Sequence, residues 1–92
     1  MTTRLILAVK ELRDNGTFIE ISIYEDEVAT PPNTHPYRYV LFFGRKLECL
    51  VRYDNRLGSG DRREVEGVDG PYTFVDLDRL LDDFKNDTEQ WE

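Results

Sequence analysis

The segment over residues 17–24 alternates strictly between two kinds of side chain, with β-branched residues at every odd position. A period of two places the two sets on opposite faces of a β-strand. Asn15-Gly16 directly precedes the segment, and this pair tolerates the positive φ angles of a tight hairpin turn. The chain is therefore predicted to begin as an antiparallel hairpin, with strands over 4–13 and 17–25.

A second hairpin is predicted further along the chain. Its strands cover residues 37–43 and 47–54, with Gly44-Arg45 as the turn signal. A long, Gly-rich connection follows over 54–71, and a short strand is predicted over 72–74. The first half of the chain is thus expected to form most of an antiparallel sheet.

The hydrophobic period changes to that of a helix near the C-terminus. A helix is predicted over 77–90, with Asp76 as its N-cap. Its apolar stripe consists of Leu77, Leu80, Leu81, Phe84 and Trp91. We expect one domain over residues 1–92 of the α+β class: an antiparallel meander of four to five strands with the helix on one face.

The run Leu5–Val9 is apolar at every position, unlike the alternating strand that follows it. A strand that is apolar on both faces is typical of the interior of a sheet, so a central position is predicted for it. One helix can cover only one face of such a sheet. The sequence therefore predicts either strong curling of the sheet or a homodimer interface.

The composition restricts the predicted cellular location of the protein and the cofactors that it is expected to bind. No apolar run approaches the ~18 residues of a membrane span, and no leader segment is expected at the N-terminus. The single cysteine, Cys49, excludes an intramolecular disulfide and fits a reducing compartment, so a cytoplasmic location is predicted. With one histidine and one cysteine, the chain is expected to hold neither a metal nor another cofactor.

Cys49 alternates with Leu47 and Val51, which places all three on one apolar face of the predicted strand. A buried cysteine behaves as a small hydrophobic residue, and this is the preferred interpretation. The alternative is a reactive thiol.

Charge is distributed unevenly along the chain, whose net charge is −7. Residues 36–64 carry seven basic and four acidic side chains, whereas residues 65–92 carry two basic and nine acidic ones. The overall charge opposes nucleic-acid binding, but the basic segment favours it. The acidic segment could instead contact a basic partner.

Polar side chains that could take part in binding or catalysis lie close together in sequence where the fourth predicted strand enters the long connection. Alternation places Arg52 and Asp54 on one face and Tyr53 on the other. Arginine can hold a phosphate bidentately, tyrosine can stack on a base, and aspartate can accept a proton. The alternative is an ion-paired strand end, with Asp54-Asn55 forming a turn.

His35 lies between two proline-containing segments, close in sequence to Tyr37 and Tyr39. An imidazole titrates near neutrality and can act as a general acid or base. The alternative, favoured by composition alone, is a loop histidine whose ring packs on a tyrosine.

Several short motifs, in this order and spacing, resemble a known family. They are Gly16-x-Phe18-x-Glu20, His35-x-Tyr37-x-Tyr39, Arg52-Tyr53-Asp54-Asn55, Gly58, Gly60-Asp61, Gly67, Tyr72-x-Phe74 and Leu80-Leu81-x-Asp83-Phe84. The chain resembles the TumE family, small toxins of prokaryotic toxin–antitoxin pairs. The resemblance spans nearly the whole chain.

The resemblance implies a helix-turn-helix antitoxin as partner, and toxicity through RNA cleavage or another translational target. The residues that it marks by position are His35, Arg52, Asp54, Asn55 and Asp61. Together with the basic segment, they define the site that we expect. The catalytic set is His35, Arg52, Asp54 and Asp61, and the substrate-binding set is Tyr37, Tyr53, Asn55, Arg56, Arg62 and Arg63.

The sequence departs from the family pattern after Gly60-Asp61, where the pattern continues with His-x-His. Arg62 and Glu64 stand at these positions. Two hypotheses follow: a ribonuclease whose catalysis rests on other groups, or a non-enzymatic module that binds a basic partner through the acidic C-terminal helix.

Overall fold

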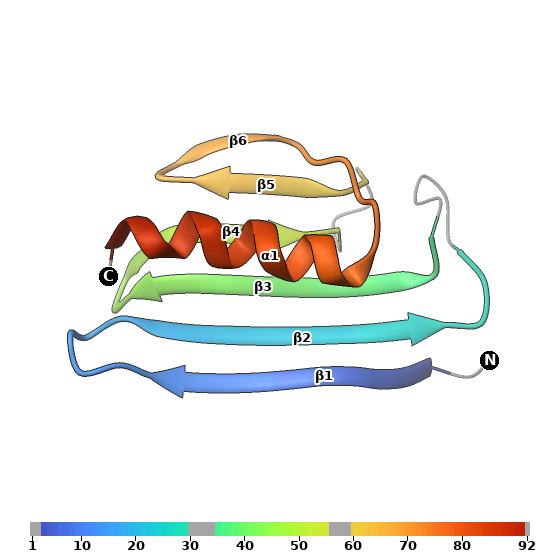
Figure 1. Cartoon of the computed structure of the whole chain (residues 1–92), viewed down its shortest axis with the longest axis horizontal. Coiled ribbons are helices and arrows are strands. Elements are labelled where there is room, and N and C mark those ends of the chain that lie inside the picture. The colour runs from blue at the N-terminus through green and yellow to red at the C-terminus, as the bar shows by residue number, and fades with distance from the viewer. Residues whose placement is uncertain (1–2, 30–34, 56–59, 92) are drawn as a thin grey trace.

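The computed structural model describes residues 3–29, 35–55 and 60–91, which form a six-stranded antiparallel sheet and one helix (Figure 1). Neighbouring strands in the chain are neighbours in the sheet, so the topology is a meander in the order β1-β2-β3-β4-β5-β6. The elements are β1 (Thr3–Leu12), β2 (Phe18–Asp26), β3 (Tyr37–Arg45), β4 (Glu48–Asp54), β5 (Arg62–Val65), β6 (Val68–Pro71), α1 (Leu77–Thr88) and the 3-10 turn η1 (Glu89–Trp91). The α+β class is confirmed, with six strands rather than four or five. No helix among the described residues has the length and apolar character needed to span a membrane.

The first predicted hairpin is confirmed. β1 pairs with β2 in antiparallel register, and Gly16 in the connecting turn has a φ of +86°. The Asn15 Oδ1 atom accepts hydrogen bonds from the backbone N–H of Thr17 at 3.0 Å and from its hydroxyl at 2.6 Å. The turn thus uses glycine for its backbone conformation and asparagine for its hydrogen bonds.

The turn of the second hairpin lies later than predicted. Gly44 and Arg45 end β3, and the turn residues are Lys46 and Leu47. Leu47 has a φ of +65° and is 99% exposed. The prediction failed because the left-handed position here is filled by leucine, which gives no sequence signal for a turn.

A β-bulge in this hairpin changes the face that Cys49 occupies. Val51 lies opposite Phe43 and Cys49 lies opposite Gly44, so Leu50 is the extra residue. Cys49 therefore lies on the other face from Val51, and the predicted shared face was wrong. Burial, followed by the negative charge of Glu64, raises the pKa of the Cys49 thiol, which disfavours the reactive thiolate.

The segment over 54–71, predicted as a long connection, contains a third hairpin. β5 pairs with β4, β6 pairs with β5, and the turn uses Glu66 and Gly67 at φ angles of +50° and +83°. The last strand ends at Pro71, so the strand predicted over 72–74 was wrong. Each strand of this hairpin has only four residues, with one valine in each. The pairing of β5 with β4 and of β6 with β5, rather than hydrophobic periodicity, determines their conformation.

β1 is an edge strand, and the predicted central position was wrong. Its apolar residues remain accessible: Leu5 is 54% exposed, Ile6 is 37% exposed and Leu12 is 81% exposed. Among the described residues, only β2 pairs with β1. The apolar run therefore marks an uncovered strand rather than a buried one.

The helix lies across β3 and β4, as Figure 1 shows, and covers one face of the sheet as predicted. Its N-cap is confirmed, because the Asp76 side chain accepts a hydrogen bond from the backbone N–H of Arg79 at 2.8 Å. Leu80 and Phe84 are buried against the sheet core. The helix ends at Thr88, two residues before the predicted end, and η1 continues to Trp91. The core consists of Ile19, Ile23, Tyr39, Leu41, Phe43, Leu50, Val51, Tyr53, Leu80 and Phe84.

The opposite face of the sheet, here called the open face, carries none of the described helices. Alternation from the core residues assigns Phe18, Phe42, Arg52 and Arg62 to it. Phe18 and Phe42 stack there with ring centroids 5.3 Å apart.

Candidate functional site

The predicted site residues that the structure describes lie mainly in three separate groups. The first, here called the strand-end cluster, consists of His35, Tyr39, Asn55 and Asp61, with Phe74 packed against it on the helix side of the sheet. It lies where β3 begins and β4 ends. The second is the pair of Arg52 and Asp54 on the open face.

His35 is fixed on both ring nitrogens and on one ring face. Its Nε2 atom lies 3.0 and 3.1 Å from the two carboxylate oxygens of Asp61, and its Nδ1 accepts a hydrogen bond from the backbone N–H of Tyr37 at 3.2 Å. Because Nδ1 is the acceptor, Nε2 carries the proton that is donated to Asp61. The ring stacks on Phe74 at 3.8 Å between centroids, and the residue is only 9% exposed. His35 thus joins the loop before β3 to the segment before β5.

Asp61 also accepts a hydrogen bond from the Tyr39 hydroxyl at 2.7 Å. Burial, reinforced by this carboxylate, raises the pKa of the Tyr39 phenol, so the phenol stays protonated. Tyr39 is therefore a hydrogen-bond donor within the cluster rather than a proton acceptor.

Asn55 connects the end of β4 to the start of β3. Its Oδ1 accepts from the backbone N–H of Tyr39 at 3.0 Å, and its Nδ2 donates to the carbonyl of Tyr37 at 2.7 Å. Only 4% of the residue is exposed. The side-chain amide of Asn55 therefore takes the place of the backbone hydrogen bonds between β3 and β4 at the point where β4 ends.

Arg52 and Asp54 are two residues apart on β4 and share a face, as predicted. The Arg52 Nε lies 2.6 Å from the Asp54 Oδ2, and the side chains are 42% and 5% exposed. The contact at 2.6 Å is made by Nε of the guanidinium. Arg62 follows on β5 directly opposite Asp54, where its NH2 contacts Asp69 at 2.6 Å.

Tyr53 and Arg63 belong to a third group, which faces the helix. Arg63 binds the Asp87 carboxylate through Nε and NH2, both at 2.8 Å, and its Nε also lies 2.9 Å from the Tyr53 hydroxyl. The Tyr53 hydroxyl donates to Asp87 as well. We call Tyr53, Arg63 and Asp87 the helix clamp, because they join β4 and β5 to α1.

Tyr37 and Arg56 complete the predicted substrate-binding set. Tyr37 is half-buried, and its ring centroid lies 5.8 Å from that of Phe74. Arg56 lies outside the described residues. Within those residues, no group of three histidine, cysteine or acidic side chains is placed to hold a metal ion.

Three residues outside the predicted site sets take part in these contacts: Asp69, Phe74 and Asp87. Asp87 gave the clearest signal, because it stands seven residues after Leu80 and three after Phe84, on the buried stripe of the helix. A carboxylate at such a position needs a basic partner. Asp69 and Phe74 lie in the segment that was expected to be irregular or differently paired.

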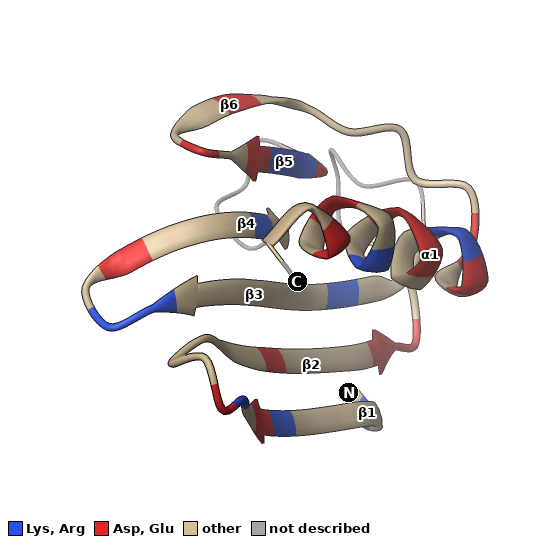
Figure 2. Cartoon of the chain, turned by 60° about the vertical axis from the view of Figure 1, so that its left-hand side comes forward, with Lys and Arg blue, Asp and Glu red and all other residues tan. Residues whose placement is uncertain are grey.

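Ion pairing changes the meaning of the charge distribution. Three of the seven basic residues of 36–64 pair with carboxylates from elsewhere in the chain: Arg38 with Asp26, Arg62 with Asp69 and Arg63 with Asp87. Figure 2 shows acidic positions concentrated on α1 and basic ones on β3 to β5. The two halves of the chain thus partly neutralise each other within the fold.

A comparison of the sequence with protein families identifies the family of this chain. The sequence model of the family described as Toxin TumE matches residues 2–92, so the chain belongs to the TumE family of toxins. Neither the curated proteins nor the solved structures contain a match.

Proposed function

We propose that this member of the TumE family is the toxin of a type II toxin–antitoxin pair and that it acts on RNA in the cytoplasm. The observation that carries the proposal is the Arg52–Asp54 pair. A buried carboxylate holds the Nε of Arg52 at 2.6 Å, and the Arg52 side chain remains 42% exposed on the open face of the sheet. Such an arginine is oriented in advance for a phosphate group.

The neighbouring residues support contact with a single-stranded nucleic acid. The Phe18–Phe42 stack lies on the same face, and Arg62 is opposite Asp54 in the adjacent strand. Single-stranded nucleic acids are commonly bound by basic grooves combined with aromatic platforms. In this proposal Arg52 and Arg62 contact the backbone phosphates.

Cleavage would require proton transfer in addition to phosphate binding. Attack of a ribose 2′-hydroxyl on the adjacent phosphorus needs a base, and departure of the 5′-oxygen needs an acid. Asp54 is the carboxylate that contacts Arg52, and we propose that it accepts the proton of the 2′-hydroxyl, while the departing 5′-oxygen takes its proton from solvent water. His35 would first have to release Asp61 or the Tyr37 N–H, since both of its nitrogens are engaged.

A second candidate function is binding without catalysis. It is favoured by the engagement of both His35 nitrogens and by carboxylates that remain exposed, Asp78 and Asp82 on α1 and Glu89 on η1. In this alternative, the helix docks a basic partner such as a helix-turn-helix antitoxin.

Induced expression of matched variants separates the two candidates. We expect wild type to arrest growth and to generate new RNA ends, and Arg52→Ala to lose both effects. The control is Arg45→Ala, which removes a 50% exposed arginine that also has a carboxylate partner, Glu48, at the other end of the sheet. Growth arrest by Arg52→Ala equal to that by wild type would refute the RNA site.

The binding alternative has its own test. Reversing charge in the Asp78→Lys, Asp82→Lys double variant should abolish co-purification of a basic partner encoded by the adjacent gene. Retained co-purification would exclude the helix as the docking surface. If wild type neither arrests growth nor produces RNA ends, only this second candidate survives.

A further inference from the structure

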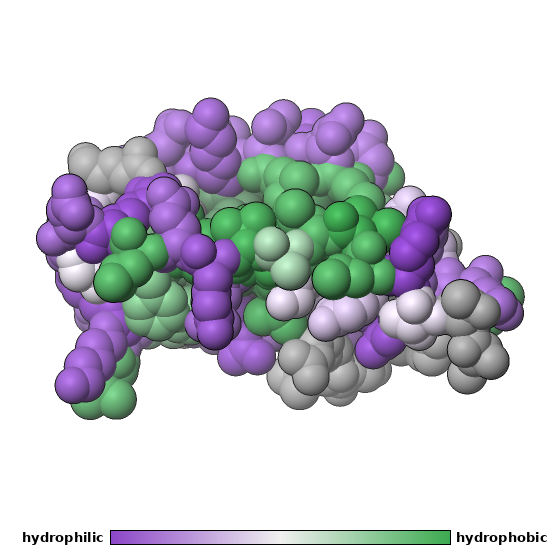
Figure 3. Space-filling model, turned by 90° about the horizontal axis from the view of Figure 1, so that it is seen from below, coloured by the Kyte–Doolittle hydropathy of each residue, from purple (hydrophilic) through white to green (hydrophobic). Residues whose placement is uncertain are grey.

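The outer edge of β1 combines a long strand with an apolar surface. The strand has ten residues, and among the described residues it has a neighbour on one side only. Figure 3 views the molecule from the β1 side and shows an apolar band in the middle with hydrophilic residues at both ends. An edge with free backbone groups and apolar side chains is a template for pairing with another strand.

We propose that the β1 edges of two copies of this chain pair antiparallel about a two-fold axis at Ala8, which joins two sheets into one of twelve strands. The partner at this edge is a second copy of the chain, because the faces and charges of β1 match those of a second β1 strand that runs antiparallel to it. The argument rests on which faces the β1 side chains occupy and on the positions of its charges.

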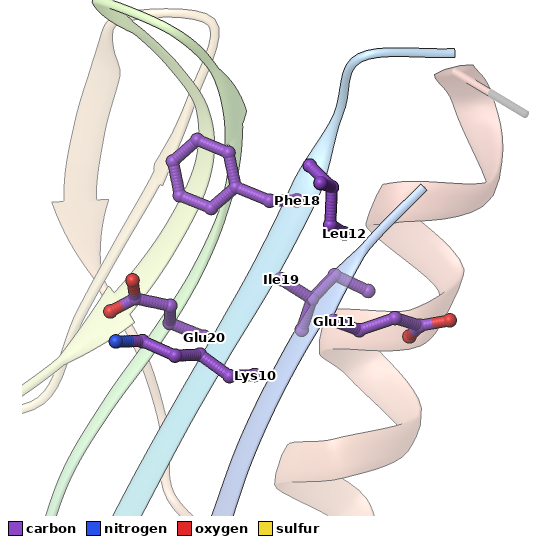
Figure 4. Close-up of a pocket in the computed structure, with 6 residues that line it drawn as sticks. All are labelled: Lys10, Glu11, Leu12, Phe18, Ile19 and Glu20. Carbon is purple, nitrogen blue, oxygen red and sulfur yellow. The ribbon is translucent and has the colours of Figure 1, made fainter. Parts of the chain in front are cut away.

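The faces of β1 follow from its register with β2. Leu7, Val9 and Glu11 lie opposite Ile23, Ile21 and Ile19, so they share the helix side of the sheet. Figure 4 shows Glu11 on that side together with Ile19, and Lys10 on the other. A register shift between Leu5 and Leu7 brings Arg4 to the helix side as well, opposite Glu25.

A two-fold axis that relates two antiparallel edge strands keeps each face on its own side. Residues that lie opposite each other must therefore come from the same face. The axis then passes midway between the two copies of one residue, which lies opposite itself. With the axis at Ala8, Leu7 lies opposite Val9 of the second copy. Beyond the bulge, Leu5 lies opposite Lys10 and Arg4 lies opposite Glu11 of that copy.

This register gives the dimer two identical ion pairs. Arg4 is 70% exposed and already contacts Glu25, so Glu11 of the second copy would complete a row of alternating charges on the helix side. An axis at Leu7 would place Arg4 opposite Val9, and an axis at Val9 would leave Arg4 beyond the paired strands. Ala8 is also the smallest side chain of the strand, which suits the point where both copies meet.

Charge reversal tests both the dimer and its register. Wild type should scatter light as a particle of twice the 10.8 kDa chain. Glu11→Arg alone and Arg4→Glu alone each create two like-charge contacts, and each should weaken dimerisation roughly tenfold to a hundredfold. An equimolar mixture of the two variants restores both opposite-charge contacts and should recover the dimer.

The matched control is Glu20→Arg, which makes the same charge change on an exposed residue one strand inside the edge. It should remain dimeric. Circular dichroism of each variant checks that the fold is retained, so that loss of the dimer is read as an interface effect.

Three outcomes would overturn the proposal. Wild type could be monomeric at every accessible concentration, or the mixture of variants could fail to recover the dimer. The third outcome is that wild type is monomeric on its own and that Glu11→Arg prevents binding of the antitoxin. That result would assign the β1 edge to the antitoxin instead of to a second copy.

Discussion

Arg63 and Asp87 join the third hairpin to the C-terminal helix through two parallel hydrogen bonds of 2.8 Å. The residues are 24 positions apart in the chain. Asp87 is largely buried, with its side chain 12% exposed, whereas that of Arg63 is 43% exposed. A bidentate pair of this kind fixes both distance and orientation, and it accounts for the stable position of a hairpin that has few apolar residues.

Removing the carboxylate of the helix clamp should destabilise the fold. In Asp87→Asn, the charge-assisted hydrogen bonds to Arg63 are weakened and a buried donor faces the guanidinium. We expect the free energy of unfolding to fall by about 1–3 kcal/mol in urea titrations. Asp82→Asn, an exposed change on the same helix, should stay within about 0.5 kcal/mol of wild type. Equal losses in the two variants would contradict a specific role for the clamp.

The helix clamp also predicts how stability depends on pH. Burial would raise the pKa of the Asp87 carboxyl, but the hydrogen bonds from Arg63 and Tyr53 outweigh burial and hold that pKa below its ordinary value. A lowered pKa in the folded state gives stability that is complete above the unfolded pKa of about 4 and is lost as the pH falls through the folded pKa. The difference between wild type and Asp87→Asn should therefore shrink in unfolding experiments below about pH 4. A difference that grows on acidification would refute this assignment.

The buried amide that joins β3 to β4 gives a third prediction. In Asn55→Ala, the N–H of Tyr39 and the carbonyl of Tyr37 lose their partner, and we expect a loss of about 2–4 kcal/mol in the free energy of unfolding. Asn55→Asp should cost at least as much, because it places a carboxylate oxygen against the Tyr37 carbonyl. Asn86→Ala, on the exposed side of the helix, is the control and should show no loss. Full stability of Asn55→Ala would mean that water replaces the amide.

The sequence predicted the elements that depend on hydrophobic period and turn chemistry. The alternation after Asn15-Gly16 determined the first hairpin, and the apolar stripe with Asp76 determined the helix. The prediction failed for β5 and β6, because these short strands have no local hydrophobic period and their conformation depends on the pairing of β5 with β4 and of β6 with β5. The sequence also misplaced the run Leu5–Val9, because its composition fits the centre of a sheet, whereas β1 is an edge strand.

For the candidate site, the sequence predicted a strand face shared by two residues, but it did not predict the contacts between residues that are far apart in the chain. The shared face of Arg52 and Asp54 followed from alternation and is confirmed. The contact between His35 and Asp61 spans 26 positions, and neither spacing nor composition indicates it. The charges of the basic segment were counted correctly, but their partners could not be predicted before the third hairpin was known.

Chemical modification of the chain's only histidine should report on the strand-end cluster. His35 is covered by Phe74 and bound by Asp61, so we expect slow reaction with diethyl pyrocarbonate in wild type. Phe74→Ala removes the stacked ring and should increase the rate several-fold, with a loss of about 2–4 kcal/mol in stability. Phe18→Ala, which removes a ring from the open face, should leave the rate unchanged. A fast reaction in wild type would show that His35 is accessible to a substrate without rearrangement.

The turn between β3 and β4 contains a residue whose replacement should increase the stability of the fold. Leu47 has a φ of +65°, a conformation that costs a residue with a Cβ about 1–2 kcal/mol. Since it is 99% exposed, its side chain contributes no packing that a substitution would remove. Leu47→Gly should therefore raise the free energy of unfolding by about 1 kcal/mol, measured by urea or thermal unfolding. The neighbouring Lys46→Gly is the control: Lys46 has no positive φ, so glycine there should lower stability through the greater entropy of the unfolded chain. If both variants lost stability equally, the left-handed conformation of Leu47 would carry no cost.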